Sequence, residues 1–315
     1  PSTEIEVTTV AKGLEHPWGL AFLPDGRPIV TERPGRVRIV GTDGTLSPPL
    51  AGVPAVYAEG QGGLLDIALA PDFAASALVY LSYAEPREGG KSATAVARGK
   101  LVREGGGGRL EGLEVIFRQQ PAVASGFHFG SRLAFANDGS LFITTGDRGS
   151  MRAAVQDPKV PIGKVIHVGA DGRAVGEPRA PGWDPRVHSM GHRNIQGAAI
   201  APATGQLWTV EHGARGGDEL NRPEAGKNYG WPIITYGRDY SGAKIGEGTS
   251  KAGLEQPVYY WDPSIATSGL AIYSGELFPS WKGNLLVGGL AGARLARLVV
   301  ERGIVVAEEK LLGDR

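Results

Sequence analysis

Polar side chains gather at both ends of an apolar hairpin in the stretch 189–221. One turn holds His192, Arg193 and Asn194, and a glycine-rich acidic loop, residues 213–219, follows the hairpin. Arginine binds carboxylates through paired hydrogen bonds, and acidic loops supply the oxygen ligands that hard cations take. This arrangement predicts a site at the mouth of an all-β scaffold.

A histidine and an aspartate upstream are the candidates for acid–base chemistry. His128 lies in an aromatic, glycine-flanked segment just before a predicted strand, and Asp147 ends the partner strand. A neutral imidazole accepts a proton near pH 7 and releases it later, as a catalytic base must. On these residues alone, a structural histidine at a strand end and a turn-capping aspartate are equally simple interpretations. Asp218 and Glu219, taken alone, are typical of a solvated turn.

The composition limits the classes of partner. The 33 Lys and Arg balance 33 Asp and Glu, so no overall field recruits nucleic acid or an anionic membrane. No apolar run is long enough for a membrane span. There is no cysteine, which excludes disulfides and suits oxidising and reducing compartments alike. The chain begins at Pro1 without a visible signal peptide, so a processed exported protein and a cytosolic protein both stay open.

Five strand–turn–strand units recur along the chain. The first, GLAFLPDGRPIVTE, is an apolar run, a Pro-Asp-Gly turn and a second apolar run, and four others follow the same plan. Asp-Gly between apolar runs is a strong hairpin signal, and 49 glycines and 22 prolines suit many short turns. The units cover residues 19–32, 64–83, 131–147, 196–211 and 268–289.

Several units are followed by a further strand that has its own turn. These strands are GRVRIV (35–40), GKVIHV (163–168) and ARLARLVV (293–300). Each unit therefore amounts to about four antiparallel strands, and four-stranded units repeated radially are typical of a β-propeller. The glycine run 105–108 is predicted to form a hairpin tip.

The whole chain, residues 1–315, is predicted to be one all-β domain: a six-bladed β-propeller of four-stranded antiparallel blades. Five units are present, and the chain stops where a sixth inner hairpin is expected, so the last blade is predicted to be incomplete. The orphan strand 4–10 (EIEVTTV) is expected to complete that blade, as N-terminal strands commonly do in closed propellers. A true five-bladed ring is the alternative.

Several motifs in a fixed order give the chain a family resemblance. They are EGQGGLL (59–65), the segment 127–132, TGD (145–147), GHRNIQG (191–197), EHG (211–213) and GKNYGWP (226–232). In this combination the sequence resembles the soluble quinoprotein sugar dehydrogenases, specifically the PQQ-dependent aldose sugar dehydrogenases, over nearly all of its 315 residues. The resemblance implies a six-bladed enzyme that uses PQQ and calcium to oxidise aldoses at C1 to the lactone.

The resemblance also implies catalytic and cofactor-binding roles. His128 matches the family's base, which takes the proton of the sugar C1 hydroxyl while hydride passes to C5 of PQQ. Asp147 matches a carboxylate that orients this ring or stabilises the imidazolium. PQQ is a planar quinone with three carboxylates, so its site needs cations and amide donors. The residues that match PQQ contacts are Gln61, Arg193, Asn194 and Tyr240.

Two calcium sites are implied in the same way. Calcium takes oxygen ligands, backbone carbonyls included. Gly213 and Ala214 match residues whose carbonyls hold the calcium that polarises the quinone, although some relatives have a proline where Ala214 stands. Glu219 and Tyr229 match a second, structural calcium site, with Tyr229 acting through its carbonyl.

Two other functions stay open from the residues. A calcium-dependent lactone hydrolase would hold calcium on the central axis by carboxylates and Asn from several blades. A non-catalytic propeller would bind sugar or protein partners. For the dehydrogenase, the expected partners are an aldose and an external electron acceptor. The expected state is a monomer or weak dimer, and the expected location is periplasmic or secreted.

Overall fold

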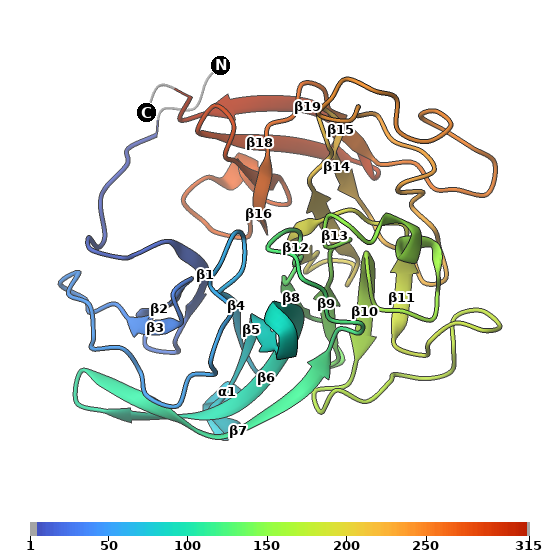
Figure 1. The fold of residues 1–315 in the computed structure, drawn as a ribbon. Helices are drawn as coiled ribbons and strands as arrows, with labels where there is room; N and C mark the ends of the chain where they lie inside the picture. Colours follow the sequence, from blue (N-terminus) through green and yellow to red (C-terminus); the bar gives the residue numbers. More distant parts are fainter. Residues whose placement is uncertain (1–4, 314–315) are drawn as a thin grey trace.

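The computed structural model describes residues 5–313 as five antiparallel sheets arranged around a centre (Figure 1). Each sheet is built from consecutive strands, and the first strand of each contacts the first strand of the next. Each sheet is therefore one blade of a β-propeller, as predicted. Among the described residues, no helix has the length and apolar character needed to cross a bilayer.

The blades follow one another along the chain. Blade 1 is β1 (Pro17–Phe22), β2 (Pro28–Glu32) and β3 (Arg36–Ile39). Blade 2 is β4 (Leu64–Leu69), β5 (Leu78–Arg87), β6 (Lys91–Glu104) and β7 (Gly107–Arg118). Blade 3 is β8 (Leu133–Phe135), β9 (Leu141–Thr144), β10 (Lys164–Val168) and β11 (Val187–Met190). Blade 4 is β12 (Ile195–Ile200), β13 (Leu207–Glu211), β14 (Asp218–Asn221) and β15 (Tyr259–Trp261). Blade 5 is β16 (Thr267–Ile272), β17 (Leu285–Gly289), β18 (Arg294–Glu301) and β19 (Ile304–Leu311).

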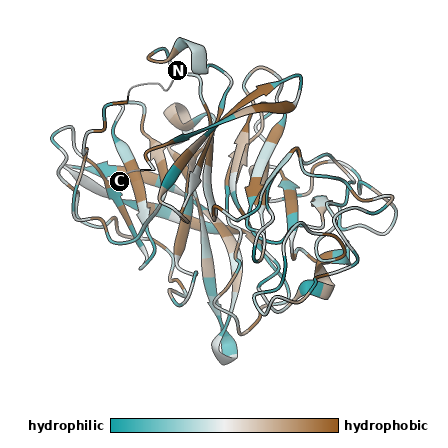
Figure 2. Ribbon diagram, turned by 90° about the horizontal axis from the view of Figure 1, so that it is seen from above, coloured by the Kyte–Doolittle hydropathy of each residue, from teal (hydrophilic) through white to brown (hydrophobic). Residues whose placement is uncertain are grey.

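The hydrophobic core is divided among the spaces between neighbouring blades. Ile29 and Val37 of blade 1 pack with Leu64 and Leu81 of blade 2. Equivalent cores join blades 2 and 3, blades 3 and 4, and blades 4 and 5. Figure 2 shows the apolar residues concentrated along the strands. Burial against a neighbouring blade fixes the register of the strands, and with it the position of the loops at their ends.

Glycine allows the inner strands to converge. A Cβ on Gly19 of β1 would lie 2.9 Å from the nitrogen of Ile67 in β4. A Cβ on Gly197 of β12 would lie equally close, at 2.9 Å, to the nitrogen of Leu270 in β16. Real Cβ contacts are longer than this, so these two positions admit only glycine without displacing the next blade.

The five predicted inner hairpins all form, and residues 105–106 join β6 to β7 where a hairpin tip was predicted. The prediction of six blades is wrong for this chain, because the described residues form five. The described residues contain no strand of the predicted sixth, incomplete blade. Blade 5 has four strands, and blade 1 is the blade with three.

The predicted strand 4–10 is not found. Residue 4 lies outside the described residues, and residues 5–10 have no strand conformation. Instead, the segment passes over a turn of blade 1, where a Cβ on Gly44 would lie 2.4 Å from the carbonyl oxygen of Val10. A strand needs a ladder of hydrogen bonds, and within the described chain β19 pairs with β18 alone.

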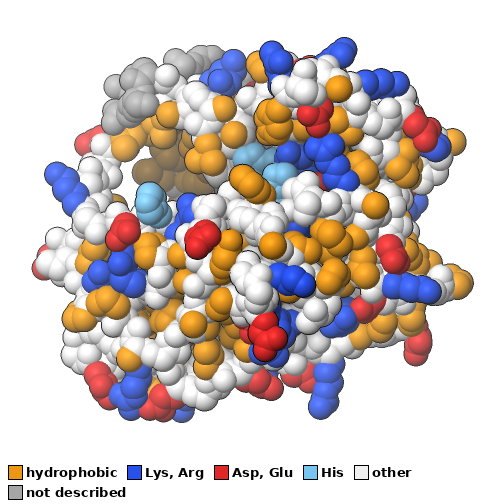
Figure 3. Space-filling model, in the orientation of Figure 1, with side chains coloured by type: hydrophobic (Ala, Val, Ile, Leu, Met, Phe, Trp, Pro, Cys, Tyr) orange, Lys and Arg blue, Asp and Glu red, His pale blue; other side chains and the backbone are white. Residues whose placement is uncertain are grey.

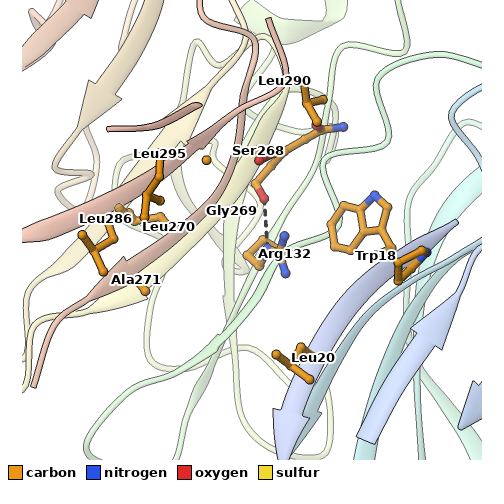
Figure 4. A pocket seen from close by; sticks show the side chains of 13 residues that line it. Trp18, Leu20, Arg132, Ser268, Gly269, Leu270, Ala271, Leu286, Leu290 and Leu295 are labelled. Atoms are coloured by element: carbon orange, nitrogen blue, oxygen red, sulfur yellow. Dashed lines mark hydrogen bonds between the residues drawn. The ribbon is translucent and has the colours of Figure 1, made fainter. Parts of the chain in front are cut away.

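A cavity of about 620 Å³ separates blade 5 from blade 1. Figure 4 shows its walls, in which Trp18 and Leu20 of β1 face Leu270 and Leu295 of blade 5. Arg132 also lines the cavity, and its guanidinium lies 4.2 Å from the centre of the Trp18 ring. The described residues therefore have hydrophobic cores on four sides of the ring and a cavity on the fifth.

Candidate functional site

The β8–β9 hairpin brings the two predicted catalytic residues together. His128 precedes the hairpin and Asp147 follows it, and His128 Nδ1 lies 2.6 Å from Asp147 Oδ1. The two side chains are 13% and 1% exposed. With Nδ1–H donating to the carboxylate, the other ring nitrogen, Nε2, is the one free to accept a proton.

Asp147 is held by three donors. Besides His128, the Gly149 amide donates to Oδ1 at 2.7 Å, and the Trp231 indole Nε1–H donates to Oδ2 at 2.8 Å. Burial opposes ionisation of Asp147, but the hydrogen bond and charge of His128 outweigh it, with help from the Gly149 amide. The pKa of this carboxyl therefore lies below its ordinary value. Asp147 is an ionised acceptor with a fixed orientation.

Trp231 is a site residue for which the sequence suggested no role. It lies in the motif GKNYGWP, on a loop of blade 4, and is 84 positions from Asp147 in the chain. A tryptophan in this fold is more often a core residue, so its type alone did not point to the site. Its conspicuous Gly-Trp-Pro setting was the only signal.

Gln61 contacts the segment that carries the base. Its side-chain Oε1 accepts a hydrogen bond of 2.8 Å from the His128 backbone amide. The backbone amide of Gln61 donates to the Gly126 carbonyl at 2.7 Å. The structure thus places this predicted cofactor contact beside His128, where it fixes the backbone of that residue.

Arg193 and Asn194 complete the same cluster from blade 4. The Arg193 carbonyl accepts from the Asp147 amide at 2.8 Å, and Asn194 Oδ1 accepts from the Gly130 amide at 3.0 Å. The Arg193 guanidinium lies 5.4 Å from the centre of the Trp231 ring. Its Nε is buried and has no hydrogen-bond partner within residues 5–313, and Asn194 Nδ2 likewise has none. These two N–H groups are therefore available to an anionic ligand.

Tyr240 stands apart from this cluster. Its side chain is 70% exposed and makes no hydrogen bond or ring contact with the described part of the chain. Its neighbour Asp239 pairs with Arg152 at 3.3 Å, and Arg152 lies 5.4 Å from the Trp231 ring. The loop of Tyr240 thus borders the site, but the ring itself is not packed into it. Figure 3 shows histidine and Lys or Arg side chains at the middle of this face, beside a hollow.

Carboxylates crowd the other side of Arg193. Glu211 accepts hydrogen bonds from His192 Nδ1 at 2.8 Å and from the Arg193 amide at 2.6 Å. Asn221 Nδ2 lies 3.0 Å from an oxygen of Glu211 and 3.0 Å from one of Glu219. Burial, followed by the charge of Glu211, raises the pKa of Glu219 to about 8. Asn221 Oδ1 is buried without a partner among the described residues, so the donor set suits a hard cation.

The remaining predicted calcium ligands lie around these carboxylates. The Gly213 amide donates to Asp218 at 2.9 Å, and Ala214 is buried in the cluster that contains Trp231. The Tyr229 ring stacks on His192 with a centroid distance of 4.9 Å, and its hydroxyl donates to a backbone carbonyl. Within residues 5–313, no hydrogen bond joins Glu219 to Tyr229. In the same residues, His, Asp and Glu side chains form no group of three suited to a metal.

The sheets define a β-propeller that carries a hydrogen-bonded imidazole–carboxylate pair beside its β8–β9 hairpin. The family model for glucose/sorbosone dehydrogenases matches residues 14–315. Aldose sugar dehydrogenase YliI of Escherichia coli strain K12 is 42% identical over 321 residues, covering 100% of this chain and 85% of YliI. The chain belongs to the glucose/sorbosone dehydrogenase family, and the family predicted from the motifs is confirmed.

Solved structures agree with this assignment. A crystal structure of a glucose dehydrogenase superposes with a TM-score of 0.94 at 51% identity, over 98% of this chain and 90% of that one. The PQQ-bound form of aldose sugar dehydrogenase from Streptomyces coelicolor superposes with a TM-score of 0.80 at 32% identity, over 97% of this chain and 84% of that one.

Proposed function

We propose that this protein oxidises aldose sugars at C1 to the lactone, with PQQ and calcium as cofactors. The observation that carries the proposal is the His128–Asp147 pair at 2.6 Å, which lies beside the unpartnered N–H groups of Arg193 and Asn194. A base next to an anion-binding pair is what oxidation of a hydroxyl by a carboxylated quinone requires. The PQQ-bound relative from Streptomyces coelicolor supports the choice of cofactor.

The protein's own contribution to the reaction is proton transfer. His128 Nε2 takes the proton of the C1 hydroxyl as the C1 hydrogen leaves with its electron pair. Asp147, ionised and held by Trp231 and Gly149, keeps the ring oriented and stabilises the imidazolium that forms. When bound, PQQ supplies the acceptor for the hydride. Loss of one proton and one hydride converts the cyclic aldose into its lactone.

Binding of PQQ is assigned to the blade 4 side of the cluster. Arg193 Nε and Asn194 Nδ2 would donate to its carboxylates, because both are N–H groups of this cluster that have no hydrogen-bond partner in the described chain. Gln61 fixes the backbone of His128. Gln61 and Tyr240, which lies on a loop that borders the site, are also proposed to contact PQQ. The Trp231 ring offers a flat apolar surface beside Arg193.

Calcium binding is assigned to the acidic stretch of blade 4. The raised pKa of Glu219 and the unpartnered Asn221 Oδ1 support this assignment, because a divalent cation would satisfy both groups. Gly213 and Ala214 would supply carbonyl oxygens near PQQ, and Tyr229 a carbonyl at the Glu219 site. The ring stacking and hydroxyl bond of Tyr229 hold its backbone in place for this role.

The reaction also requires an electron sink, because each turnover leaves two electrons on the cofactor. The proposal therefore includes an external electron acceptor. It also includes the monomer or weak dimer and the periplasmic or secreted location that the family resemblance implies.

Reconstitution tests the proposal. The protein is incubated with PQQ and calcium, glucose or another aldose is added, and reduction of a dye acceptor is followed. We expect turnover in the wild type and its loss in His128→Gln. His167→Gln is the matched control, since His167 lies on β10 and hydrogen-bonds Ser140 outside the site. Absence of dye reduction by wild-type holoprotein with every aldose would contradict the assignment.

A further inference from the structure

Arg148 is a buried arginine that the proposed chemistry does not use. Its side chain is fully buried, at 0% exposure, and it forms no ion pair with a carboxylate in residues 5–313. Burial lowers its pKa to about 10. A buried cation without a paired carboxylate is costly unless its N–H groups are satisfied in another way.

The guanidinium is satisfied by the segment that surrounds His128. Arg148 Nε donates to the Phe127 carbonyl at 3.0 Å, and Nη2 donates to the Ser125 carbonyl. Its planar face lies 3.8 Å from the centre of the Phe129 ring. Arg148 thus contacts the residues on both sides of His128 but not His128 itself.

A third attachment anchors this contact to blade 2. Arg148 Nη1 donates to the Ser92 carbonyl and Nη2 to the Ser92 hydroxyl, both at 3.0 Å. Ser92 lies in β6, whose pairing with β5 and β7 makes it part of a rigid sheet. In return, the Ser125 hydroxyl donates to the Arg148 carbonyl at 2.7 Å.

The backbone of His128 needs such support. Its φ is +52°, in the left-handed region that costs a residue with a side chain on the order of 1 kcal/mol. Such a conformation persists only where the surroundings hold it. The Gln61 side chain fixes the His128 amide, and Arg148 fixes the carbonyl of the preceding residue and the ring of the following one.

We propose that Arg148 is a positioning residue that sets the His128–Asp147 contact. Arg148 follows Asp147 directly in the chain and binds the residues that flank His128, so one side chain fixes the base relative to its carboxylate. The guanidinium is specific to this task, because its planar fork serves several carbonyls and the Phe129 ring at once, which an ammonium cannot. This inference rests on the proposed function only for its kinetic consequence.

The test compares Arg148→Lys with Arg297→Lys. Arg297 is a matched control: it lies on β18 in blade 5, hydrogen-bonds Asn284 and Glu309, and stacks 5.0 Å from the Trp281 ring. For Arg148→Lys we expect kcat to fall by about tenfold to a hundredfold, with KM for the aldose changed less than about threefold. Arg297→Lys should leave both constants near wild type.

A second readout needs no cofactor. In the protein without PQQ, the Nδ1 proton of His128, identified by its loss in His128→Gln, reports the Asp147 hydrogen bond by NMR. This signal should broaden or move upfield in Arg148→Lys and stay in place in Arg297→Lys. If wild-type protein oxidises no aldose, this arm still decides the positioning role, while the proposed function fails separately.

A milder variant covers the case in which Arg148→Lys does not fold. Ser92→Ala removes one acceptor of Arg148 and also the hydrogen bond from the Ser92 hydroxyl to the Ser125 carbonyl, and it leaves the guanidinium in place. We expect kcat to fall by about two- to fivefold, within the range for the loss of one or two hydrogen bonds. Wild-type kcat together with an unchanged His128 signal, in whichever Arg148 or Ser92 variant folds, would overturn the proposal. A loss confined to KM would overturn it as well.

Discussion

The two sides of the candidate site differ in how complete they are. On the base side, His128 and Asp147 are paired, and Gln61 and Trp231 close the remaining hydrogen bonds. On the cation side, in the stretch 211–221, carboxylates face each other, the pKa of one is raised to about 8, and an amide oxygen is buried without a described partner. The chain alone builds the first side, and the second has the character of a site completed by ligands.

This difference has a physical reason. The base must hold its orientation before substrate arrives, because catalytic geometry tolerates little error. A cation site gains its affinity from carboxylates that repel one another until the ion is bound. Changes on the base side should therefore alter turnover, and changes on the cation side should alter binding and ligand-dependent stability.

The largest effect is expected for His128→Gln. Removing the base should lower kcat by about 10³-fold, within the range for general base catalysis. PQQ affinity, measured by absorbance titration, should stay within about threefold of wild type, because Arg193 and Asn194 are untouched. A large loss of PQQ affinity would show that the base side also holds the cofactor. That result would contradict the assignment of turnover to one side and ligand binding to the other.

Glu219→Gln should act on the cation side alone. Calcium at about 100 times its Kd should stabilise the wild type by about 2.7 kcal/mol, and the variant should lose most of this gain. Thermal unfolding with and without calcium measures it. Glu255→Gln is the control, since Glu255 is an exposed partner of Lys227. Equal calcium stabilisation of wild type and Glu219→Gln would remove Glu219 from the calcium site.

Trp231→Phe should lower kcat by about tenfold. The variant keeps the aromatic surface beside Arg193 but leaves one oxygen of a buried carboxylate without its donor, which costs roughly 1–3 kcal/mol. Steady-state kinetics should show the change in kcat, with calcium stabilisation unaltered. If kcat is unchanged, Asp147 is held without the indole.

A further prediction concerns the pH dependence of stability and rests on Lys164, which lies on β10. Its ammonium donates to the Val155 and Ile162 carbonyls, both at 2.7 Å, and burial lowers its pKa to about 7. Between this value and its ordinary value of about 10.4, the unfolded chain binds a proton that the folded chain does not. Lys164 therefore makes stability rise with pH across this window, by up to about 1.4 kcal/mol per unit.

Lys164→Met should remove this contribution. Urea unfolding of both proteins at several pH values between about 7 and 10 gives the difference in unfolding free energy. We expect the unfolding free energy of the wild type to increase relative to that of the variant as the pH rises. Parallel curves would mean that the carbonyls keep Lys164 charged throughout the window.

The sequence predicted the repeating architecture well, because each hairpin is a local pattern. Residues 131–147, with Asn-Asp-Gly between two apolar runs, became β8 and β9 as expected. The blade count was wrong because it depended on closure of the ring, which is not local. The prediction of a strand at 4–10 was wrong for the same reason. Its residues favour a β-strand, but residues 5–10 pair with no strand of the described chain and run across a turn of blade 1.

The candidate site was predicted only as far as residue types reveal it. His128, Asp147, Gln61, Arg193 and Asn194 do come together, as the ordered motifs suggested. The hydrogen bonds that hold these residues in place could not be predicted from the sequence. An indole 84 positions away binds the aspartate, and an arginine next to it binds the segment around the base. Such contacts depend on how blades pack, which no short pattern encodes.

Hydrogen exchange of backbone amides, with and without PQQ and calcium, tests the contrast between the two sides most directly. Amides of residues 126–130 should be protected to about the same extent in both states, because the chain alone holds them. Amides of residues 213–221 should gain at least about tenfold protection when the ligands bind. Free exchange at 126–130 in the protein without ligands, or equal protection of 213–221 in both states, would contradict the account.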